Sequence, residues 1–334
     1  MPMHPMVLRP GVQPRALLGL ALCGLLLAAG CRLAFAQEGP EPEKLRALAL
    51  ELVNKSRAEH KLPPLQIGKE VNEAAKAHAA DMLRRNFYAH VTPEGKTIQD
   101  RFLKAGGSRW QLSAENIARC TGCELGVQTV EEFQRGWMNS KGHRENILRK
   151  GITQFGFSMV AQKGKPLYAV QTFTGPGAPS GLAGNESAKR LSEKEVTAKA
   201  LEILNKERKQ AGRPAFVESP ALTKAVRSLL PATKKLDEFD LSQTGKVMDA
   251  LPEAERKNWQ ALTTLAAACG GCGAEPTAAD VRAFVQQWLS NSGNKTMVLN
   301  PASTHLGFAL ATSGQGKKVA LAVIGRKPAK GGAD

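Results

Sequence analysis

The chain has 334 residues, 42% of them hydrophobic, and carries a formal net charge of +16. This length and hydrophobic content allow two ordinary domains with a core in each. The basic excess is spread evenly along the chain without a basic arm, which argues against a nucleic-acid-binding protein and is compatible with loose association with anionic surfaces. A solvated surface with surplus lysine explains the same composition.

Residues 1–36 are expected to be a secretory signal peptide. Arg9 and Arg15 precede the apolar run ALLGLALCGLLLAAG, and AFA, which ends at Ala36, offers small residues for cleavage. The run LAAGC also resembles a weak lipoprotein box, which would leave a lipid on Cys31 instead. Because a transmembrane helix needs about 20 apolar residues, we expect a mature protein that is secreted, or anchored to the cell envelope by a lipid, without a transmembrane span.

The remaining sequence contains a duplication. The segment ALELVNKSRAEHKLPPL, residues 49–65, aligns with ALEILNKERKQAGRPAF, residues 200–216, at an offset of 151. Similarity at a fixed offset is the signature of a repeated unit. The segment GPGAPSGLAGNES between the copies is rich in Gly, Pro and Ser, which predicts a linker. We therefore expect four segments after the signal peptide: a first copy over 40–175, a linker over 176–190, a second copy over 191–325 and a basic tail over 326–334.

Each copy predicts the same order of elements. In the first copy an amphipathic helix is indicated by helical spacing of apolar residues, namely Leu45, Leu48, Ala49, Leu52 and Val53. A second helix follows, with Val71, Ala74, Ala75, Ala79, Met82 and Leu83 on one face. A polar stretch, a third helix around 128–139 and two strand-like runs, FGFSMVA and LYAVQTF, complete the copy. Helices around an antiparallel sheet predict an α+β fold.

Four cysteines beyond the signal peptide form two CxxC pairs, Cys120 with Cys123 and Cys269 with Cys272. Each pair occupies the same loop of its own copy, and an exported chain favours disulfides. We therefore expect each pair to close a local disulfide. Free or redox-active thiols and a zinc site shared by the two pairs are the alternatives.

Candidate site residues lie in the first copy. His90 and His143 fall in FYAHVTPEGKT and NSKGHRENIL, which we expect to be polar loops, and Glu115 lies in the otherwise small and apolar segment SAENIA. Separations of 25 and 28 residues form no local metal motif, so the spacing by itself favours ordinary surface loops. No ligand role is assigned to the other histidines beyond the signal peptide, which are His60 at a helix end, His78 on an apolar helix face and His305 at a strand start.

Four motifs in this order, FYAHVTPEGKT, AENIA, W-x-x-S-x-GHR-x-NIL and FGFSM…LYAVQTF, resemble the CAP superfamily, which includes cysteine-rich secretory proteins, venom antigens, pathogenesis-related proteins and exported bacterial proteins. The resemblance is strongest to the bacterial branch, covers about residues 43–175 and implies an α-β-α sandwich. It also implies a cleft that gathers His90, Glu115 and His143 and can hold a divalent metal. The second acid of the family falls near Ser140 and is missing.

The second copy lacks these side chains. The segment WMNSKGHRENIL, residues 137–148, aligns with WLSNSGNKTMVL, residues 288–299, in which Asn294 replaces His143. His90 and Glu115 fall opposite about Asp240 and Thr264. Because apolar landmarks such as Trp288 persist, we expect a degenerate CAP-like copy that folds without the site.

The resemblance implies an exported, non-enzymatic binding module for lipid, cell-wall or protein ligands, with zinc or another divalent cation held by His90 and His143. An anionic envelope surface or lipid is the expected partner. The alternative is a metal-assisted hydrolase, a peptidase or wall-acting enzyme that uses the same cleft around a metal-activated water. The sequence shows no nucleophile with a matching base and lacks the second acid, so we favour binding and leave enzymatic activity open.

Overall fold

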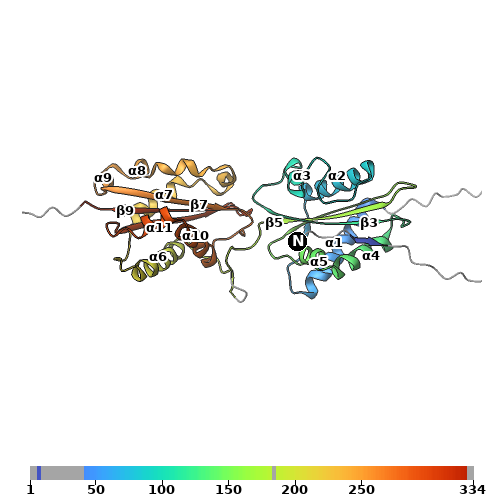
Figure 1. Ribbon diagram of the computed structural model, residues 1–334, viewed down its shortest axis with the longest axis horizontal. Coiled ribbons are helices and arrows are strands. Elements are labelled where there is room, and N and C mark those ends of the chain that lie inside the picture. The colour runs from blue at the N-terminus through green and yellow to red at the C-terminus, as the bar shows by residue number, and fades with distance from the viewer. Residues whose placement is uncertain (1–5, 9–40, 183–185, 329–334) are drawn as a thin grey trace, which may run out of the picture. The chain divides into compact units, whose positions relative to one another are not determined.

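The computed structural model describes residues 6–8, 41–182 and 186–328 (Figure 1). The expected cleavage site at Ala36, the alternative lipidation site at Cys31 and most of the basic tail lie outside these residues. The chain divides into two compact units. The first consists mainly of residues up to 173 and the second mainly of residues from 174 onward, with the short segments 106–113 and 149–153 grouped with the second.

The first repeat contains five helices and four strands after the segment of the signal peptide. The helices are α1 (Pro42–Glu59), α2 (Lys69–Arg85), α3 (Ile98–Lys104), α4 (Val127–Asn139) and α5 (Lys141–Ile147). The strands are β2 (Gln66–Ile67), β3 (Leu112–Cys120), β4 (Gln154–Val160) and β5 (Leu167–Gly175). They form a sheet of order β3-β5-β4-β2, to which β1 (Met6–Leu8), within the expected signal peptide, adds a parallel strand beside β3.

The second repeat has the same plan. Its helices are α6 (Glu193–Gln210), α7 (Pro220–Leu229), α8 (Val247–Ala250), α9 (Glu253–Arg256), α10 (Ala278–Ser290) and α11 (Ser292–Val298), with the 3-10 helices η1 (Thr233–Glu238) and η2 (Leu241–Gly245). Its strands are β6 (Val217–Glu218), β7 (Ala261–Cys269), β8 (His305–Thr312) and β9 (Lys318–Arg326), in the order β6-β8-β9-β7. Read from the other edge, this is the order of the first sheet, as a duplication requires.

The sheets are mixed. Strands β7 and β8 both pair antiparallel with β9, as the sequence predicts, whereas the short edge strands β2 and β6 run parallel to β4 and β8. The expectation of a purely antiparallel sheet is therefore wrong at this edge. The short strands do not follow from alternation because two residues are too few to show a period.

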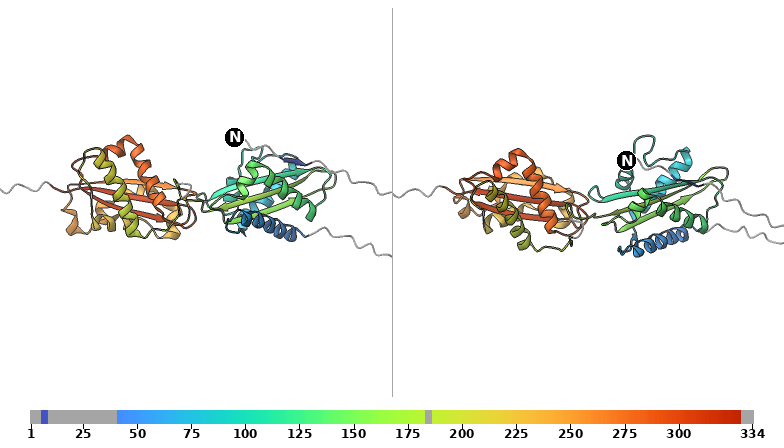
Figure 2. Two further views of the ribbon diagram at one scale, coloured as in Figure 1. Left: turned by 90° about the horizontal axis from the view of Figure 1, so that it is seen from below. Right: turned by 60° about the horizontal axis from the view of Figure 1, so that its bottom comes forward.

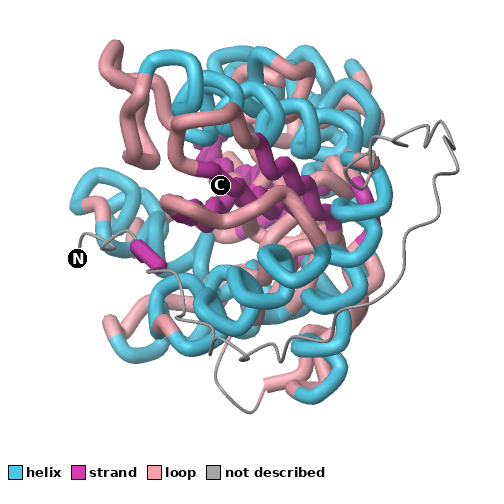
Figure 3. Tube along the Cα trace, turned by 90° about the vertical axis from the view of Figure 1, so that its right-hand side faces the viewer, coloured by secondary structure: helices cyan, strands magenta, loops and turns pink. Residues whose placement is uncertain are grey.

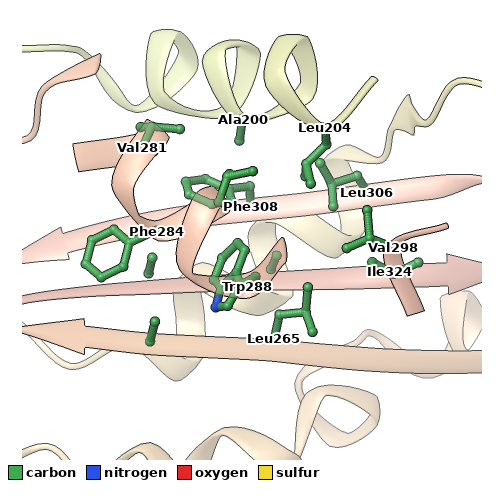
Figure 4. Packing of buried hydrophobic residues seen from close by; sticks show 14 of the residues in the cluster. Ala200, Leu204, Leu265, Val281, Phe284, Trp288, Val298, Leu306, Phe308 and Ile324 are labelled. Carbon is green, nitrogen blue, oxygen red and sulfur yellow. The ribbon is translucent and has the colours of Figure 1, made fainter. Parts of the chain in front are cut away.

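Helices cover both faces of each sheet, which gives three layers (Figures 1 and 2). Side chains of β9 alternate between two cores, because successive residues of a strand point to opposite faces. Ala320, Ala322 and Ile324 pack with residues of α6 and α10, as Figure 4 shows for part of this core. Val319, Leu321 and Val323 pack with residues of α7. Figure 3 shows the strands lying between the helices. The α-β-α sandwich predicted from the resemblance is confirmed.

The helices begin where local signals place them. Ser192 caps α6 in a capping box with Glu195, and Thr97 caps α3 in the same way with Asp100. The predicted apolar face of α2 is buried from Val71 to Met82. This face lies against Ile117, Tyr168 and Val170 of the sheet.

One expectation about the site segments is wrong, and one segment to which the sequence assigned no element is a strand. The segment SAENIA belongs to strand β3, whose residues from Ala114 to Ala118 are all buried, and His143 lies on helix α5 rather than in a loop. The polar residues within these segments hid both elements, because hydrogen bonds inside the fold take the place of apolar burial there. His90 lies in the connection between α2 and α3, as expected.

Candidate functional site

Glu115 on strand β3 is the centre of a buried polar cluster. Its side chain is 2% exposed. His90 donates a hydrogen bond from Nδ1 to Oε1 at 3.0 Å, and Arg101 donates from Nη2 to Oε2 at 2.7 Å. The Nε2 atom of His78 lies 3.7 Å from Oε1. One carboxylate therefore faces a guanidinium and two imidazoles that come from three different segments.

The cluster keeps Glu115 ionised. Burial by itself would raise the pKa of this carboxyl, but the hydrogen bond from His90 and the charges of His78, Arg101 and His90 outweigh it and hold the pKa below its ordinary value. An ionised Glu115 accepts the Nδ1 proton of His90. That bond leaves the Nε2 atom of a neutral His90 as an acceptor or a metal ligand.

Arg101 on helix α3 also fixes the backbone around His90. Besides Glu115, its Nη2 atom donates to the carbonyl oxygen of His90 at 3.1 Å, and Nη1 donates to the carbonyl oxygen of Lys96 at 3.1 Å. One side chain thus ties the connection that bears His90 to strand β3. A single bidentate guanidinium can hold both partners because its donors are arranged in a rigid fork.

His143 is buried on α5, with 1% of its surface exposed. Both of its ring nitrogens, and Nε2 of His90, are buried without a hydrogen-bond partner among the described residues. Burial, and secondarily the nearby His90, lower the pKa of His143 to about 4, so the ring is neutral at pH 7. No hydrogen bond or ion pair joins His143 to Glu115 in the described part of the chain. The structure therefore joins His90 to Glu115 directly and places His143 near His90.

Buried amides hold α5 against β3. Asn146 donates from Nδ2 to the carbonyl oxygen of Glu115 and to Oδ1 of Asn116, both at 3.0 Å, and Asn116 donates to the carbonyl oxygen of His143 at 3.2 Å. Asn116 also donates to Gln171, which donates to Gln134 at 2.9 Å. In these bonds the two asparagines hold backbone carbonyl groups. They fix the backbone at both Glu115 and His143.

Other residues near these motifs have ordinary roles. Arg144 donates to the carbonyl oxygen of Met138 at 2.8 Å. Glu131 lies 4.0 Å from Arg135, Glu132 accepts from Gln128, and Glu145 is exposed. None of these three acids takes the place of the missing second acid in the recorded contacts of His90 and His143.

Sequence reasoning missed Arg101 and underrated His78. His78 is a buried core residue, as expected, and its Nε2 atom lies 2.9 Å from the carbonyl oxygen of Ala89, whereas its Nδ1 atom is buried without a hydrogen-bond partner among the described residues. It also borders Glu115. Burial lowers its pKa. Its place on the apolar face of a helix was a local signal for burial. Arg101 offered no signal, since it lies among charged residues in a segment with no predicted element.

The donor set fits a metal only in part. Among the described residues, no group of three or more His, Cys, Asp or Glu side chains is arranged to hold a metal ion. The unpartnered nitrogens of His90 and His143 offer two imidazole donors, and Glu115 orients the ring of His90 through its Nδ1 atom. This arrangement fits a site with two protein ligands and open positions better than a closed four-ligand structural zinc site.

The sequence model of the CAP family, the cysteine-rich secretory protein family, matches residues 50–173 and again residues 201–324. Together the two matches cover well over half of the chain. This protein belongs to the CAP family. The tandem matches also agree with the two repeats of the fold, so the second copy is a CAP domain despite its lost polar residues.

Two curated relatives of this CAP protein come from Bacillus subtilis strain 168. Uncharacterized protein YkwD is 36% identical over 111 residues, which are 33% of this chain and 40% of the relative. Uncharacterized membrane protein YlbC is 35% identical over 107 residues, which are 32% of this chain and 29% of the relative. The chain thus spans less than half the length of either relative.

Solved structures of similar proteins include an extracellular SCP-domain protein from Bacillus anthracis, with 30% identity, a TM-score of 0.34 and 40% coverage of both chains. Na-ASP-1 matches over 88% of this chain and 92% of its own, with 10% identity and a TM-score of 0.40. Within the described residues, no helix is both long and apolar enough to cross a bilayer.

The second CAP repeat keeps the strand and the helix that carry Glu115 and His143 in the first repeat, but other side chains occupy these two positions. Thr264 is the fourth residue of β7, as Glu115 is of β3, and Asn294 is the third residue of α11, as His143 is of α5. Asp240 is exposed and caps η2 by accepting a hydrogen bond from the backbone of Ser242. The structure therefore supports the alignment at the positions of Glu115 and His143.

Both CAP repeats carry the predicted disulfide. Cys120 is bonded to Cys123 and Cys269 to Cys272, each at the end of the equivalent strand, β3 or β7. The local pairing is confirmed, and the four cysteines are not arranged as a shared zinc site.

Proposed function

We propose that this protein is an exported, non-enzymatic binding module in which the first CAP repeat holds a divalent cation, zinc or a similar ion, between His90 and His143. The cation would present its open positions to a lipid, cell-wall or protein ligand. The second repeat would serve as a structural or interaction domain. Export rests on the expected signal peptide.

One observation carries the proposal. Three nitrogens of the two proposed ligands, Nε2 of His90 and both ring nitrogens of His143, are buried without a hydrogen-bond partner among the residues that the structure describes. A buried polar atom without a partner costs about 1–3 kcal/mol, so an arrangement with three of them is expected to be stabilised by something that binds there. Neutral imidazole is the commonest protein ligand for zinc and similar ions.

The contacts of Glu115 favour binding over hydrolysis. A metal-assisted hydrolase needs a base that is free to take a proton from the attacking water. Glu115 is buried and already accepts hydrogen bonds from His90 and Arg101, so it orients His90 and is not free to act as that base. Neither Glu131, Glu132 nor Glu145 makes a recorded contact with the two histidines.

Calorimetric titration of the purified full chain with zinc tests the cation. We expect binding that His90→Ala with His143→Ala removes, whereas the matched double variant His60→Ala with His305→Ala, which removes two histidines outside the cluster, retains it. The variant His143→Asn introduces the residue that the second repeat has at this position. Because that residue is compatible with the fold, loss of zinc binding in this variant is not a result of misfolding. Equal binding by the wild type and the His90 and His143 variants would reject the site.

A test for enzymatic turnover distinguishes the binding module from the hydrolase. If the protein cleaves a peptide or muropeptide library and the His90 and His143 variants do not, the hydrolase alternative replaces the binding module. The mature N-terminus tests export: mass spectrometry should find a chain that begins at Gln37, or a lipid-modified Cys31 if the lipoprotein signal is used. An intact leader on the cellular protein would contradict export.

A further inference from the structure

A cavity lies in the first repeat, and neither of the two proposed cation ligands lines it. It has a volume of about 830 Å³ and opens between α2, α3 and the connection that joins them. Its lining includes neither His90, His143 nor Glu115. Ala77, Ala80 and Ala105 form an apolar part of the wall. Five cationic and four acidic side chains supply most of the rest.

Arg101 forms part of this wall and is nine-tenths buried, with 9% of its surface exposed. Its two Nη atoms are used by Glu115 and by the backbone, as described above. Its Nε atom is buried and has no hydrogen-bond partner among the described residues. Because this atom has almost no accessible surface, it is not itself open to the cavity, and Arg101 closes the inner part of the wall.

The acidic side chains of the wall already have partners. Arg85 pairs with both Asp81 and Glu94, and Arg84 also pairs with Asp81. Asp100 accepts hydrogen bonds from the backbone and hydroxyl of Thr97 at the start of α3. Glu73 lies 2.9 Å from Lys76. The carboxylates are therefore largely committed to contacts within the protein.

Two cationic side chains of the cavity wall differ from the arginines because they have no partner in the described part of the chain. Lys96 and Lys104 are exposed, both line the cavity, and neither ammonium has a hydrogen bond or ion pair in the described structure. Lys96 precedes α3 and Lys104 is the last residue of this helix, so the two lysines flank Arg101 in the sequence. The α3 side of the cavity thus presents two ammonium groups without a partner among the described residues, beside the buried guanidinium of Arg101.

We infer that this cavity binds a phosphate group. Phosphate oxygens accept charge-assisted hydrogen bonds from guanidinium and ammonium groups, and Arg and Lys are the usual protein ligands for them. Because Glu115 already offsets the charge of Arg101, the two lysines supply most of the attraction. The alanine wall suits the organic part of a phosphate ester. The site is independent of the proposed cation site, since the two share no ligand side chain.

Titration of the purified full chain with inorganic phosphate tests the inference. We expect the charge-reversal variant Lys96→Glu with Lys104→Glu to weaken phosphate binding at least tenfold. The matched variant Lys163→Glu with Lys165→Glu changes the net charge equally but alters the exposed turn between β4 and β5, and should stay within twofold of the wild type. The His90→Ala, His143→Ala variant should also retain phosphate binding, so failure of the cation site and failure of this site are distinguishable.

Vesicles distinguish the sources of the phosphate. Retention on phosphatidylcholine vesicles that contain phosphatidylglycerol, lost in the Lys96, Lys104 variant and kept in the Lys163, Lys165 variant, would identify a lipid head group. Phosphate binding without such retention would identify a soluble or polymer-borne phosphate ester. Equal losses in both lysine variants would show diffuse attraction to a basic surface and overturn the site. So would the absence of phosphate binding together with the absence of vesicle retention.

Discussion

Arg57 in the first repeat and Arg208 in the second make the same hydrogen bonds. Each donates from Nε to a carbonyl oxygen six residues further on, that of Pro63 or Pro214. Each also donates from Nη1 to a carbonyl oxygen 90 residues further on, that of Ile147 or Val298. The second CAP repeat has lost its polar cluster and has kept the contact that ties its first helix to its last one.

Arg208→Met should destabilise the second repeat by about 3 kcal/mol, because it leaves buried carbonyl oxygens without a donor. Arg208 is fully buried and also donates to the carbonyl oxygens of Asn300 and Ser303. Urea unfolding followed by tryptophan fluorescence measures the change. The exposed neighbour Arg213 gives a control, since Arg213→Met should change stability by less than about 0.5 kcal/mol. Similar losses in both variants would contradict a specific role for Arg208.

Glu115→Gln should destabilise the first repeat by about 3–5 kcal/mol, because it leaves the buried charge of Arg101 without its partner. The control Glu145→Gln, at an exposed position, should have little effect. Adding Arg101→Met to Glu115→Gln should recover part of the loss, and a double-mutant cycle measures that coupling. Strictly additive losses would show that the two side chains do not stabilise each other.

The stability of the metal-free protein should fall between pH 6.5 and pH 4. The unfolded chain protonates His143 near its ordinary pKa, whereas the folded chain protonates it only near pH 4. The unfolded state therefore binds more protons in this window, and stability rises with pH there by roughly 3 kcal/mol in total. Urea unfolding with a chelator present, at a series of pH values, measures it. His143→Asn should flatten the profile, and an unchanged slope would refute the assignment.

Gln171→Leu should cost about 2–4 kcal/mol, since the amide accepts a hydrogen bond from Asn116 and donates one to Gln134, and the change leaves both buried partners unsatisfied. Thermal unfolding compares this variant with Gln162→Leu, in the exposed turn between β4 and β5. The same variant should weaken zinc binding, because Asn116 also holds the backbone of His143. Unaltered stability would mean that the amide chain is not a structural support.

Replacing Cys120 and Cys123 by serine should cost no more than about 2 kcal/mol, because the disulfide closes a very short loop and so removes little entropy from the unfolded chain. Mass spectrometry with alkylation before and after reduction first confirms that the thiols are bonded. A much larger loss of stability would indicate that the loop between β3 and α4 supports the core.

A large part of this protein follows from local patterns in its sequence. The spacing of apolar residues in α1 and α2 predicts both helices, because a helix with one buried face carries apolar residues at a period of 3.6 residues along the sequence. The offset of 151 residues predicts two copies of one fold, and the loss of His143 at Asn294 predicts which copy lacks the cluster. The two CxxC pairs predict their own disulfides because the partners lie in one loop.

Only the tertiary structure decided how the cluster is held. Arg101 reaches Glu115 because α3 packs beside β3, and nothing in the local sequence of either element encodes that pair. Strand β3 and helix α5 escaped prediction for the same reason: their polar residues are buried because partners from other elements satisfy them, and a period read along the chain detects apolar burial only. Contacts between distant segments depend on how the layers pack, so the geometry around Glu115 and the cavity beside Arg101 appear only once the chain is folded.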